Sequence, residues 1–278
     1  MNNLLAQNNN IDFPPNKARK EGYVLDFNEE FLSDRIDTSK WIPYYLPQWS
    51  SRESSRPNYY FSNGNLVLTI TQNQKPWCPE FNGDVKCSSL QTGIYSGKLG
   101  SNKGQHKFNP KCIVREEQVS EKKYLPKYGF FEIRAKMPAS ASNVAALWMI
   151  GYEEQPEQSA EICIVEVKGV NVKEESAIIG YGIHKFNDPS LKEEFFEDQF
   201  DIDVTKFHIY SVAWEQDKVD FYIDNKLIRS IKQAPRYPMQ FMLNIYELPL
   251  DSKGGLDLIY PKEFVIDYIR GYSKEQKI

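Results

Sequence analysis

The most informative segment of this 278-residue chain reads Ala160-Glu161-Ile162-Cys163-Ile164-Val165-Glu166-Val167. Its β-branched apolar residues predict a buried strand. In a regular strand Glu161, Cys163 and Val165 would share one face, and Glu166 would point the other way. Because a buried carboxylate is costly unless it faces water or a partner, we expect both glutamates to face a wet cleft. A β-bulge near Ile164–Val165 would return Glu166 to the face of Glu161.

Two glutamates on one face of a strand favour acid/base chemistry. With one position absorbed by the bulge, they lie about 13 Å apart along the strand. If their side chains lean together, the gap closes to about 5–5.5 Å, the separation expected of a retaining glycosidase. There one carboxylate attacks the anomeric carbon, and the other protonates the leaving oxygen and then activates water. The motif Glu-x-Cys-x-x-Glu is by itself a weak pattern, so other segments have to support it.

The segment resembles the bulged signature Glu-x-Asp-x-x-Glu of glycoside hydrolase family 16, which includes laminarinases, agarases, carrageenases and endo-β-galactosidases. The resemblance implies that Glu161 is the nucleophile and Glu166 the general acid/base. Cys163 stands where the family has an aspartate that is thought to tune the nucleophile. A thiol is a weaker hydrogen-bond partner than a carboxylate and is mostly neutral at pH 7 unless its pKa is depressed.

Other segments resemble the same family from about residue 23 to residue 272. They are the opening 28–41, the Asn-Gly hairpin of 59–70, the strand Tyr128–Pro138, the pair 207–215 and 219–228, and the closing strand 264–272. Many short strands with turn signals predict an all-β sandwich or barrel. The resemblance selects a concanavalin A-like β-jelly roll of two curved antiparallel sheets, with the cleft on the concave face.

The chain divides into a polar arm and one large domain. Residues 1–21 are Asn-rich and contain Pro14-Pro15, which predicts a flexible or loosely attached arm. We expect residues 22–278 to form a single catalytic domain of the family 16 type. The N-terminus lacks the basic start and apolar core of a signal peptide, whereas family members are mostly secreted, so the compartment stays open.

Charge and composition limit the partners. The net charge of −4 gives no reason to expect nucleic acid, and no apolar run approaches the ~20 residues that span a membrane. Aromatic residues make up 14% of the chain, which suits sugar stacking as well as a β core. Cys78 and Cys87 flank a turn-like segment and could pair. We expect a monomer that binds a polysaccharide or oligosaccharide.

Four residues before the first hairpin are candidates for sugar binding. By resemblance, Arg52, Arg56 and Asn58 line the cleft, although either arginine could equally be an ordinary surface charge. Trp49 is a candidate stacking platform, with a core tryptophan as the alternative.

Two further candidates flank the glutamate motif. Trp148 lies in a strand that a polar turn connects to Glu161, which would bring it near the cleft unless it packs in the core. His184 lies in the next strand, where many family members carry a cleft-facing histidine, although a lone histidine is more often structural.

The resemblance also implies a structural calcium ion on the convex side, held by Glu30, Gly64 and Asp267. Oxygen ligands are the type that calcium prefers. The chemistry itself requires no cofactor.

Together these observations predict an endo-acting retaining β-glycosidase, a glycoside hydrolase of polysaccharides. The favoured substrate is β-1,3- or β-1,3/1,4-glucan, cleaved by double displacement. A β-galactan-directed endo-hydrolase or a transglycosylase is the alternative enzyme. A non-catalytic carbohydrate-binding jelly roll, in which Cys163 records the loss of hydrolysis, is the alternative without chemistry.

Overall fold

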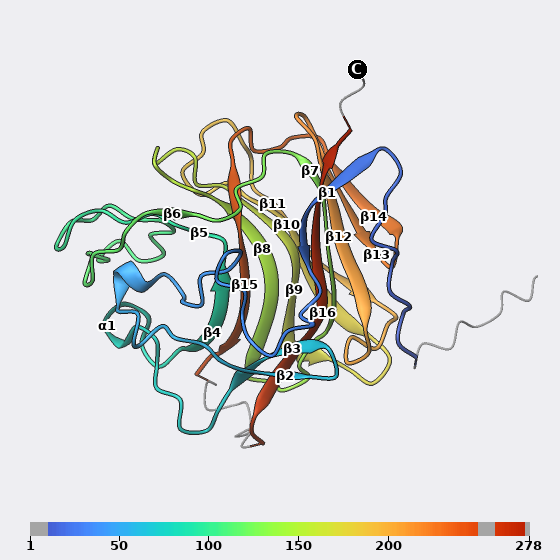
Figure 1. Cartoon of the computed structure of the whole chain (residues 1–278), viewed down its shortest axis with the longest axis horizontal. Coiled ribbons are helices and arrows are strands. Elements are labelled where there is room, and N and C mark those ends of the chain that lie inside the picture. Colours follow the sequence, from blue (N-terminus) through green and yellow to red (C-terminus); the bar gives the residue numbers. More distant parts are fainter. Residues whose placement is uncertain (1–10, 250–258, 276–278) are drawn as a thin grey trace, which may run out of the picture.

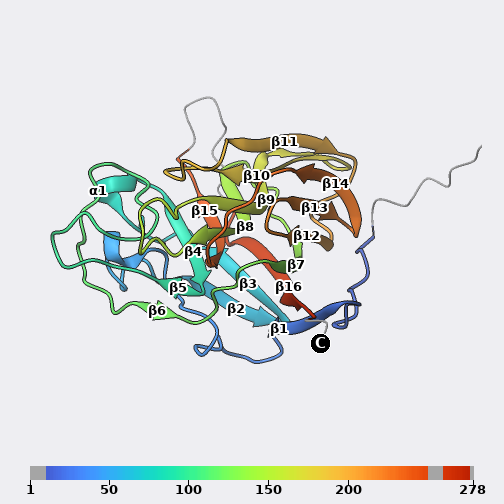
Figure 2. The same cartoon turned by 90° about the horizontal axis from the view of Figure 1, so that it is seen from above.

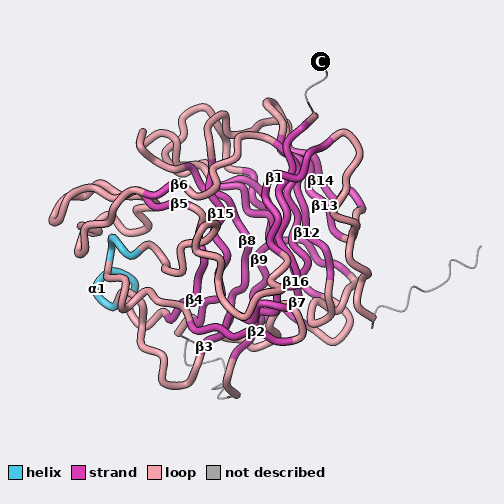
Figure 3. The backbone as a smooth tube through the Cα atoms, in the orientation of Figure 1, coloured by secondary structure: helices cyan, strands magenta, loops and turns pink. Residues whose placement is uncertain are grey.

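A computed structural model describes residues 11–249 and 259–275. Strands and loops make up nearly all of this part of the chain, as Figure 3 shows. The helical segments in it are the short α1 (Pro79–Asn82) and the 3₁₀ turn η1 (Pro47–Trp49). The all-β prediction is therefore confirmed.

Two antiparallel sheets pack face to face (Figures 1 and 2). The larger, eight-stranded sheet has the order β14-β13-β12-β7-β16-β3-β2, with β1 paired to β16. Its strands are β1 (Tyr23–Glu29), β2 (Asn58–Ser62), β3 (Asn65–Ile70), β7 (Gly129–Lys136), β12 (His208–Trp214), β13 (Val219–Ile223), β14 (Lys226–Ile231) and β16 (Lys262–Lys274). This is the larger layer of the predicted jelly roll.

The six-stranded sheet has the order β11-β10-β9-β8-β15-β4. Its strands are β4 (Lys86–Gln91), β8 (Asn143–Gly151), β9 (Glu161–Val172), β10 (Ala177–His184), β11 (Glu194–Phe200) and β15 (Met239–Glu247). A small separate pair joins β5 (Gly93–Ile94) to β6 (Glu121–Lys122). Strand β9, which holds the glutamate motif, lies between β8 and β10 within the sheet.

The main core lies between the two sheets. Phe131 and Ile133 of β7 face inward and are fully buried, as are Leu147 of β8 and Ile162 of β9. This alternation is what a strand with one face on the core requires.

The Asn-Gly turn between β2 and β3 is confirmed. Asn63 has φ 52° and Gly64 has φ 74°, so both central residues adopt the left-handed conformation that a two-residue hairpin needs. Glycine and asparagine tolerate this conformation better than other residues.

Residues 12–16 lie against the outer face of the eight-stranded sheet. The backbone N–H of Phe13 donates to the carbonyl of Phe207 at 2.7 Å, and the N–H of Asn16 donates to the hydroxyl of Tyr268 at 3.1 Å. The expectation of a loosely attached arm is therefore wrong for residues 12–16, while residues 1–10 lie outside the described part.

This segment also changes the environment of β7. The alternation of apolar and charged residues in β7 predicts that Glu132 and Arg134 lie on a half-exposed face, but they are 1% and 7% exposed. Asn16 donates to Glu132 at 3.0 Å, and Arg134 donates to the carbonyl of Phe13 through Nε at 2.9 Å and Nη2 at 2.6 Å. The docked N-terminal segment therefore buries charges that the strand pattern alone would expose.

The outer face of the six-stranded sheet carries a second hydrophobic cluster. Long loops contribute the fully buried Trp49 and Trp77, which pack over Trp148 of β8 and Cys163 of β9. Loops thus cover part of the face on which the glutamate motif is exposed.

Candidate active site

The predicted bulge is present in β9. Trp148 pairs with Cys163 and Leu147 with Val165, so Ile164 is the extra residue. Both Ile164 and Val165 consequently face the core between the sheets. The parity of the strand changes at this point, and Glu161 and Glu166 emerge on the same, outer face.

Both glutamates line one cavity of about 330 Å³. Of the predicted sugar-binding residues, Trp148 and His184 also line it. Strand alternation places Trp148 on the outer face of β8, and His184 pairs with Glu161 across β9 and β10. The structure therefore brings four of the predicted site residues together.

The environment raises the pKa of both carboxyl groups. Burial raises the pKa of Glu161 well above 4.5, and the negative charges of Glu166 and Glu193 raise it further. Burial also raises the pKa of Glu166, which the neighbouring Lys168 opposes. Two carboxylates in a desolvated cavity repel each other. The state in which the pair holds one proton is therefore favoured over the state in which both groups are ionised.

Cys163 lies beneath this cavity. Its side chain is 1% exposed and belongs to the hydrophobic cluster of the outer face. Burial raises the pKa of its thiol well above 9.0, and the charges of Glu161 and Glu166 add to the effect. Cys163 is therefore a neutral thiol at pH 7, unlike the ionisable aspartate at this position in the family signature.

Neighbouring side chains hold Trp148 and His184 in place. The indole Nε1 of Trp148 donates to Oδ1 of Asn244 at 2.5 Å. The Nδ1 atom of His184 lies 2.5 Å from Glu193, and its ring stacks on Phe195 with 4.3 Å between centroids. Such contacts fix ring orientations before a ligand arrives.

Sequence reasoning missed most of the aromatic lining. The cavity is also bounded by Tyr45, His106, Phe108, Ala146, Phe186 and Tyr246. His106 and Phe108 come from a polar, charged segment whose sequence predicts only a loop, and the ring centroid of His106 lies 5.1 Å from that of Trp148. The abundance of aromatic residues was the available signal, but it did not indicate which of them converge.

Four predicted sugar-binding residues lie elsewhere. Trp49 is 0% exposed, and its indole donates to the carbonyl of Gln105 at 2.9 Å, so it is a core residue and not a stacking platform. Arg52 donates to Gln118 at 2.7 Å and pairs with Glu121 at 3.2 Å.

Arg56 is exposed, and Asn58 begins β2, where its N–H donates to Ser88 at 2.9 Å. None of these four predicted sugar-binding residues belongs to the described residues that line the glutamate cavity. This cavity therefore gives no support to their predicted cleft role, and the segment that carries them contacts other loops and strand β4.

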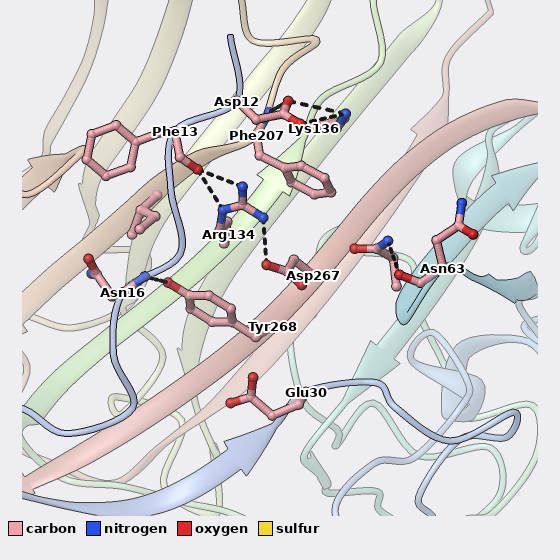
Figure 4. Close-up of polar contacts among 12 residues, drawn as sticks. Asp12, Phe13, Asn16, Glu30, Asn63, Arg134, Lys136, Phe207, Asp267 and Tyr268 are labelled. Atoms are coloured by element: carbon pink, nitrogen blue, oxygen red, sulfur yellow. Dashed lines mark hydrogen bonds and ion pairs between the residues drawn. The ribbon is translucent and has the colours of Figure 1, made fainter.

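The two carboxylates among the expected calcium ligands are paired with arginines. Arg270 donates to Glu30 through Nε at 2.6 Å and Nη2 at 2.9 Å. Arg134 donates to Asp267 at 2.6 Å and lies between that carboxylate and the carbonyl of Phe13 (Figure 4).

A guanidinium on each carboxylate is incompatible with a divalent cation at the same oxygens. Glu30, Gly64 and Asp267 therefore do not fit calcium. Residues 11–249 and 259–275 contain no group of three or more His, Cys, Asp or Glu side chains that could hold a metal.

Two smaller expectations concern cysteines and membranes. Cys78 and Cys87 were expected to be able to pair, but both are free, as are Cys112 and Cys163. Within the described ranges, no helix has the length and hydropathy needed to cross a bilayer.

Comparison with curated proteins identifies relatives that are longer than this chain. Glucan endo-1,3-beta-glucosidase A1 of Niallia circulans is 24% identical over 233 residues, which cover 78% of this chain and 30% of the relative. Endo-1,3-1,4-beta-glycanase ExsH of Rhizobium meliloti (strain 1021) is 26% identical over 258 residues, or 92% of this chain and 46% of the relative. The chain thus spans less than half the length of these relatives.

Among solved structures, the GlcNAcα1-4Gal releasing endo-β-galactosidase from Clostridium perfringens superposes with a TM-score of 0.82 and 34% identity, covering 95% of this chain and 65% of that one. A laminarinase from Flavobacterium sp. UMI-01 gives a TM-score of 0.62 at 21% identity, covering 90% of this chain and 100% of that one. The jelly-roll prediction is thus confirmed. The family model for glycosyl hydrolases family 16 matches residues 55–248, and the chain belongs to this family.

Proposed function

We propose that this chain is an endo-acting β-glycosidase that retains anomeric configuration, with Glu161 as nucleophile and Glu166 as general acid/base. The observation that carries the proposal is the bulge in β9, which delivers both glutamates to one cavity. A retaining glycosidase needs two carboxyl groups on either side of one glycosidic bond.

In the first step, a carboxylate oxygen of Glu161 forms a bond to the anomeric carbon. The bond from that carbon to the leaving oxygen breaks, and Glu166 transfers its proton to this oxygen. In the second step, Glu166 takes a proton from water, and the water oxygen displaces Glu161 from the anomeric carbon. Both carboxyl groups then regain their starting protonation.

The cavity supports the charges that this sequence requires. Burial favours a protonated Glu166 before the first transfer, since it raises the pKa of that side chain. Glu161 has to be ionised when it attacks, although burial raises its pKa as well. The positive charge that develops on the sugar in the transition state stabilises the Glu161 carboxylate at that moment.

The neighbouring cavities support endo-action. A cavity of about 300 Å³ adjoins the site on the side of Glu166 and Lys168, and one of about 340 Å³ adjoins it on the side of His106 and Phe186. Phe108 borders all three cavities. An endo-hydrolase needs room for sugar residues on both sides of the bond that it cleaves.

The curated relatives support β-1,3- or β-1,3/1,4-glucan as substrate, since their names refer to these linkages. A β-galactoside chain is the second candidate. It is favoured by the 34% identity and TM-score of 0.82 to an endo-β-galactosidase that releases GlcNAcα1-4Gal.

The test is reducing-end release from laminarin, mixed-linkage glucan, agar, carrageenan, β-galactans and a mucin that ends in GlcNAcα1-4Gal. We expect release from one of them. Glu161→Ala and Glu166→Ala should each lower turnover by about 10²-fold or more. Glu154→Ala is the matched control, because this exposed glutamate forms a surface pair with Lys122. Binding without release on any polymer would instead support the non-catalytic jelly roll.

Azide separates the two roles. In Glu161→Ala, azide should take the place of the nucleophile and give the α-glycosyl azide. In Glu166→Ala, it should intercept the glycosyl-enzyme and give the β-glycosyl azide. NMR of the anomeric proton distinguishes these products, and the opposite pairing would exchange the assigned roles. Products longer than the substrate would identify a transglycosylase.

A further inference from the structure

The cavity on the His106 and Phe186 side of the catalytic glutamates carries polar groups to which the mechanism described above gives no role. It has a volume of about 340 Å³ and shares the walls His106, Phe108 and Phe186 with the catalytic cavity. Its remaining lining is polar and consists of Lys107, Glu153, Ser159 and Asn187. A polar cavity with aromatic walls, continuous with a sugar cleft, has the composition of a carbohydrate site.

Glu153 is the chemically unusual group in this cavity. It is partly buried in the loop between β8 and β9, and its Oε1 accepts a hydrogen bond of 2.7 Å from the N–H of His106. No described residue donates a hydrogen bond to its second oxygen, Oε2. Burial raises the pKa of Glu153 to about 8. This second oxygen can accept a hydrogen bond, so a ligand hydroxyl or amide in the cavity can donate to it.

Backbone strain is concentrated at the same place. His106, Glu153 and Phe186 have φ values of 47°, 61° and 41°, in the left-handed region that L-residues rarely adopt. Each of the three lines this cavity and comes from a different loop. Clustered strain of this kind is typical of ligand sites, where the fold holds side chains in positions that a relaxed chain would not give them.

The aromatic walls suit the apolar face of a sugar ring. Phe186 is 45% exposed, and its ring centroid lies 5.5 Å from that of His106 and 5.8 Å from that of His184. Burial and the nearby His184 lower the pKa of His106 to about 4, so this imidazole is neutral. The aromatic rings therefore offer a stacking surface for a sugar ring, while Glu153 and Lys107 offer polar contacts at the edge of that ring.

We infer that the Glu153 cavity is a subsite for one sugar residue adjoining the cleavage site, and that Glu153 selects a ring that offers it a hydroxyl or amide donor. The inference rests on the proposed function. The inference extends the proposed function by naming a specificity-determining residue outside the glutamate motif.

The test uses the polymer that the wild-type protein cleaves, and oligosaccharide fragments from a partial digest of that polymer as probes. Calorimetric titration of Glu161→Ala with these fragments measures binding without turnover. Adding Glu153→Ala should raise Kd at least about tenfold, the effect of roughly 1.4 kcal/mol of lost binding. Adding Glu153→Gln should change Kd only about threefold, because the amide keeps an acceptor and the shape of the neutral carboxyl group. Adding Glu154→Ala should leave Kd unchanged.

Thermal denaturation of each variant shows whether it is folded, and Glu153→Gln tests the inference even if Glu153→Ala unfolds. An unchanged Kd in a folded Glu153→Ala variant would overturn the subsite while the proposed function stands. So would an equal loss of binding in Glu153→Gln and Glu153→Ala, since the role would then not be hydrogen bonding to a neutral group. If the wild type cleaves no polymer, the proposed function fails and the subsite fails with it.

Discussion

The carboxylate of Glu166 lies 3.6 Å from the ammonium group of Lys168, two residues further along the same strand. Lys168 also donates to Glu197 of β11 at 2.8 Å. Burial raises the pKa of Glu166, and Lys168 opposes this by stabilising the carboxylate. Regular alternation after the bulge puts these two side chains on the same face of β9, and the bulge makes this face the outer one.

Removing this lysine should therefore shift the pH dependence of turnover. In Lys168→Met the pKa of Glu166 rises, so the acid stays protonated to higher pH and the alkaline limb of kcat/KM moves upward. Lys168→Arg keeps the charge and should keep the profile. The measurement is kcat/KM against pH on the polymer that the wild type cleaves. A limb that stays in place or moves to lower pH would contradict the role of Glu166 as acid.

The cysteine of the motif should resist alkylation. Cys163 is 1% exposed, and burial holds its pKa well above 9.0, so little thiolate is available at pH 7. We expect iodoacetamide to modify Cys163 only after unfolding in urea, as mass spectrometry of native and denatured samples would show. Rapid modification of the native protein, with loss of activity, would show instead that Cys163 is an accessible thiolate.

Stability should depend on pH through Glu153. Its pKa is about 8 in the folded protein against an ordinary value of 4.5. Between these values the unfolded chain has lost a proton that the folded chain keeps, so this group makes stability fall as pH rises from about 4.5 to about 8.

Glu153→Gln removes this titration. The Tm of this variant minus the Tm of the wild type should therefore increase by a few degrees as pH rises across the same range. The check is thermal denaturation of both proteins at several pH values. A Tm difference that is constant with pH would show that Glu153 titrates normally.

Buried arginine–carboxylate pairs should stabilise the outer face of the eight-stranded sheet. Arg270 is 5% exposed and holds Glu30, while its Nη1 donates to the carbonyl of Asn16 at 2.8 Å. Arg270→Met should cost about 3 kcal/mol, the usual effect of leaving a buried charge unpaired. Lys274→Met is the control on the same strand, since its pair with Glu215 is exposed and should contribute under about 1 kcal/mol. Urea denaturation measures the free energy of unfolding of both variants. Equal losses in the two would contradict the stabilising role of the buried Arg270 pair.

Calcium should have no effect on this protein. Because Arg270 and Arg134 already neutralise Glu30 and Asp267, neither added calcium nor a chelator should change Tm. Thermal denaturation in the presence of each reagent is the measurement. A rise in Tm with calcium would show that a cation site exists despite these pairs.

Local sequence pattern was enough to predict the strands and the shared face of Glu161 and Glu166. The alternation of β7, the turn at Asn63-Gly64 and the bulge in β9 all follow from short-range rules, namely side-chain parity, turn conformation and the cost of burying a carboxylate. These rules act within a few residues, so the sequence by itself determined that Glu161 and Glu166 share a face.

Only the tertiary structure decided what surrounds them. His106 and Phe186 lie in separate loops that pack over the six-stranded sheet, and there they meet Tyr246 of β15 at the cavity. Trp49 carries the same kind of side chain as Trp148, yet one is a core residue and the other lines the cavity. That difference depends on packing between distant segments, which no local pattern encodes.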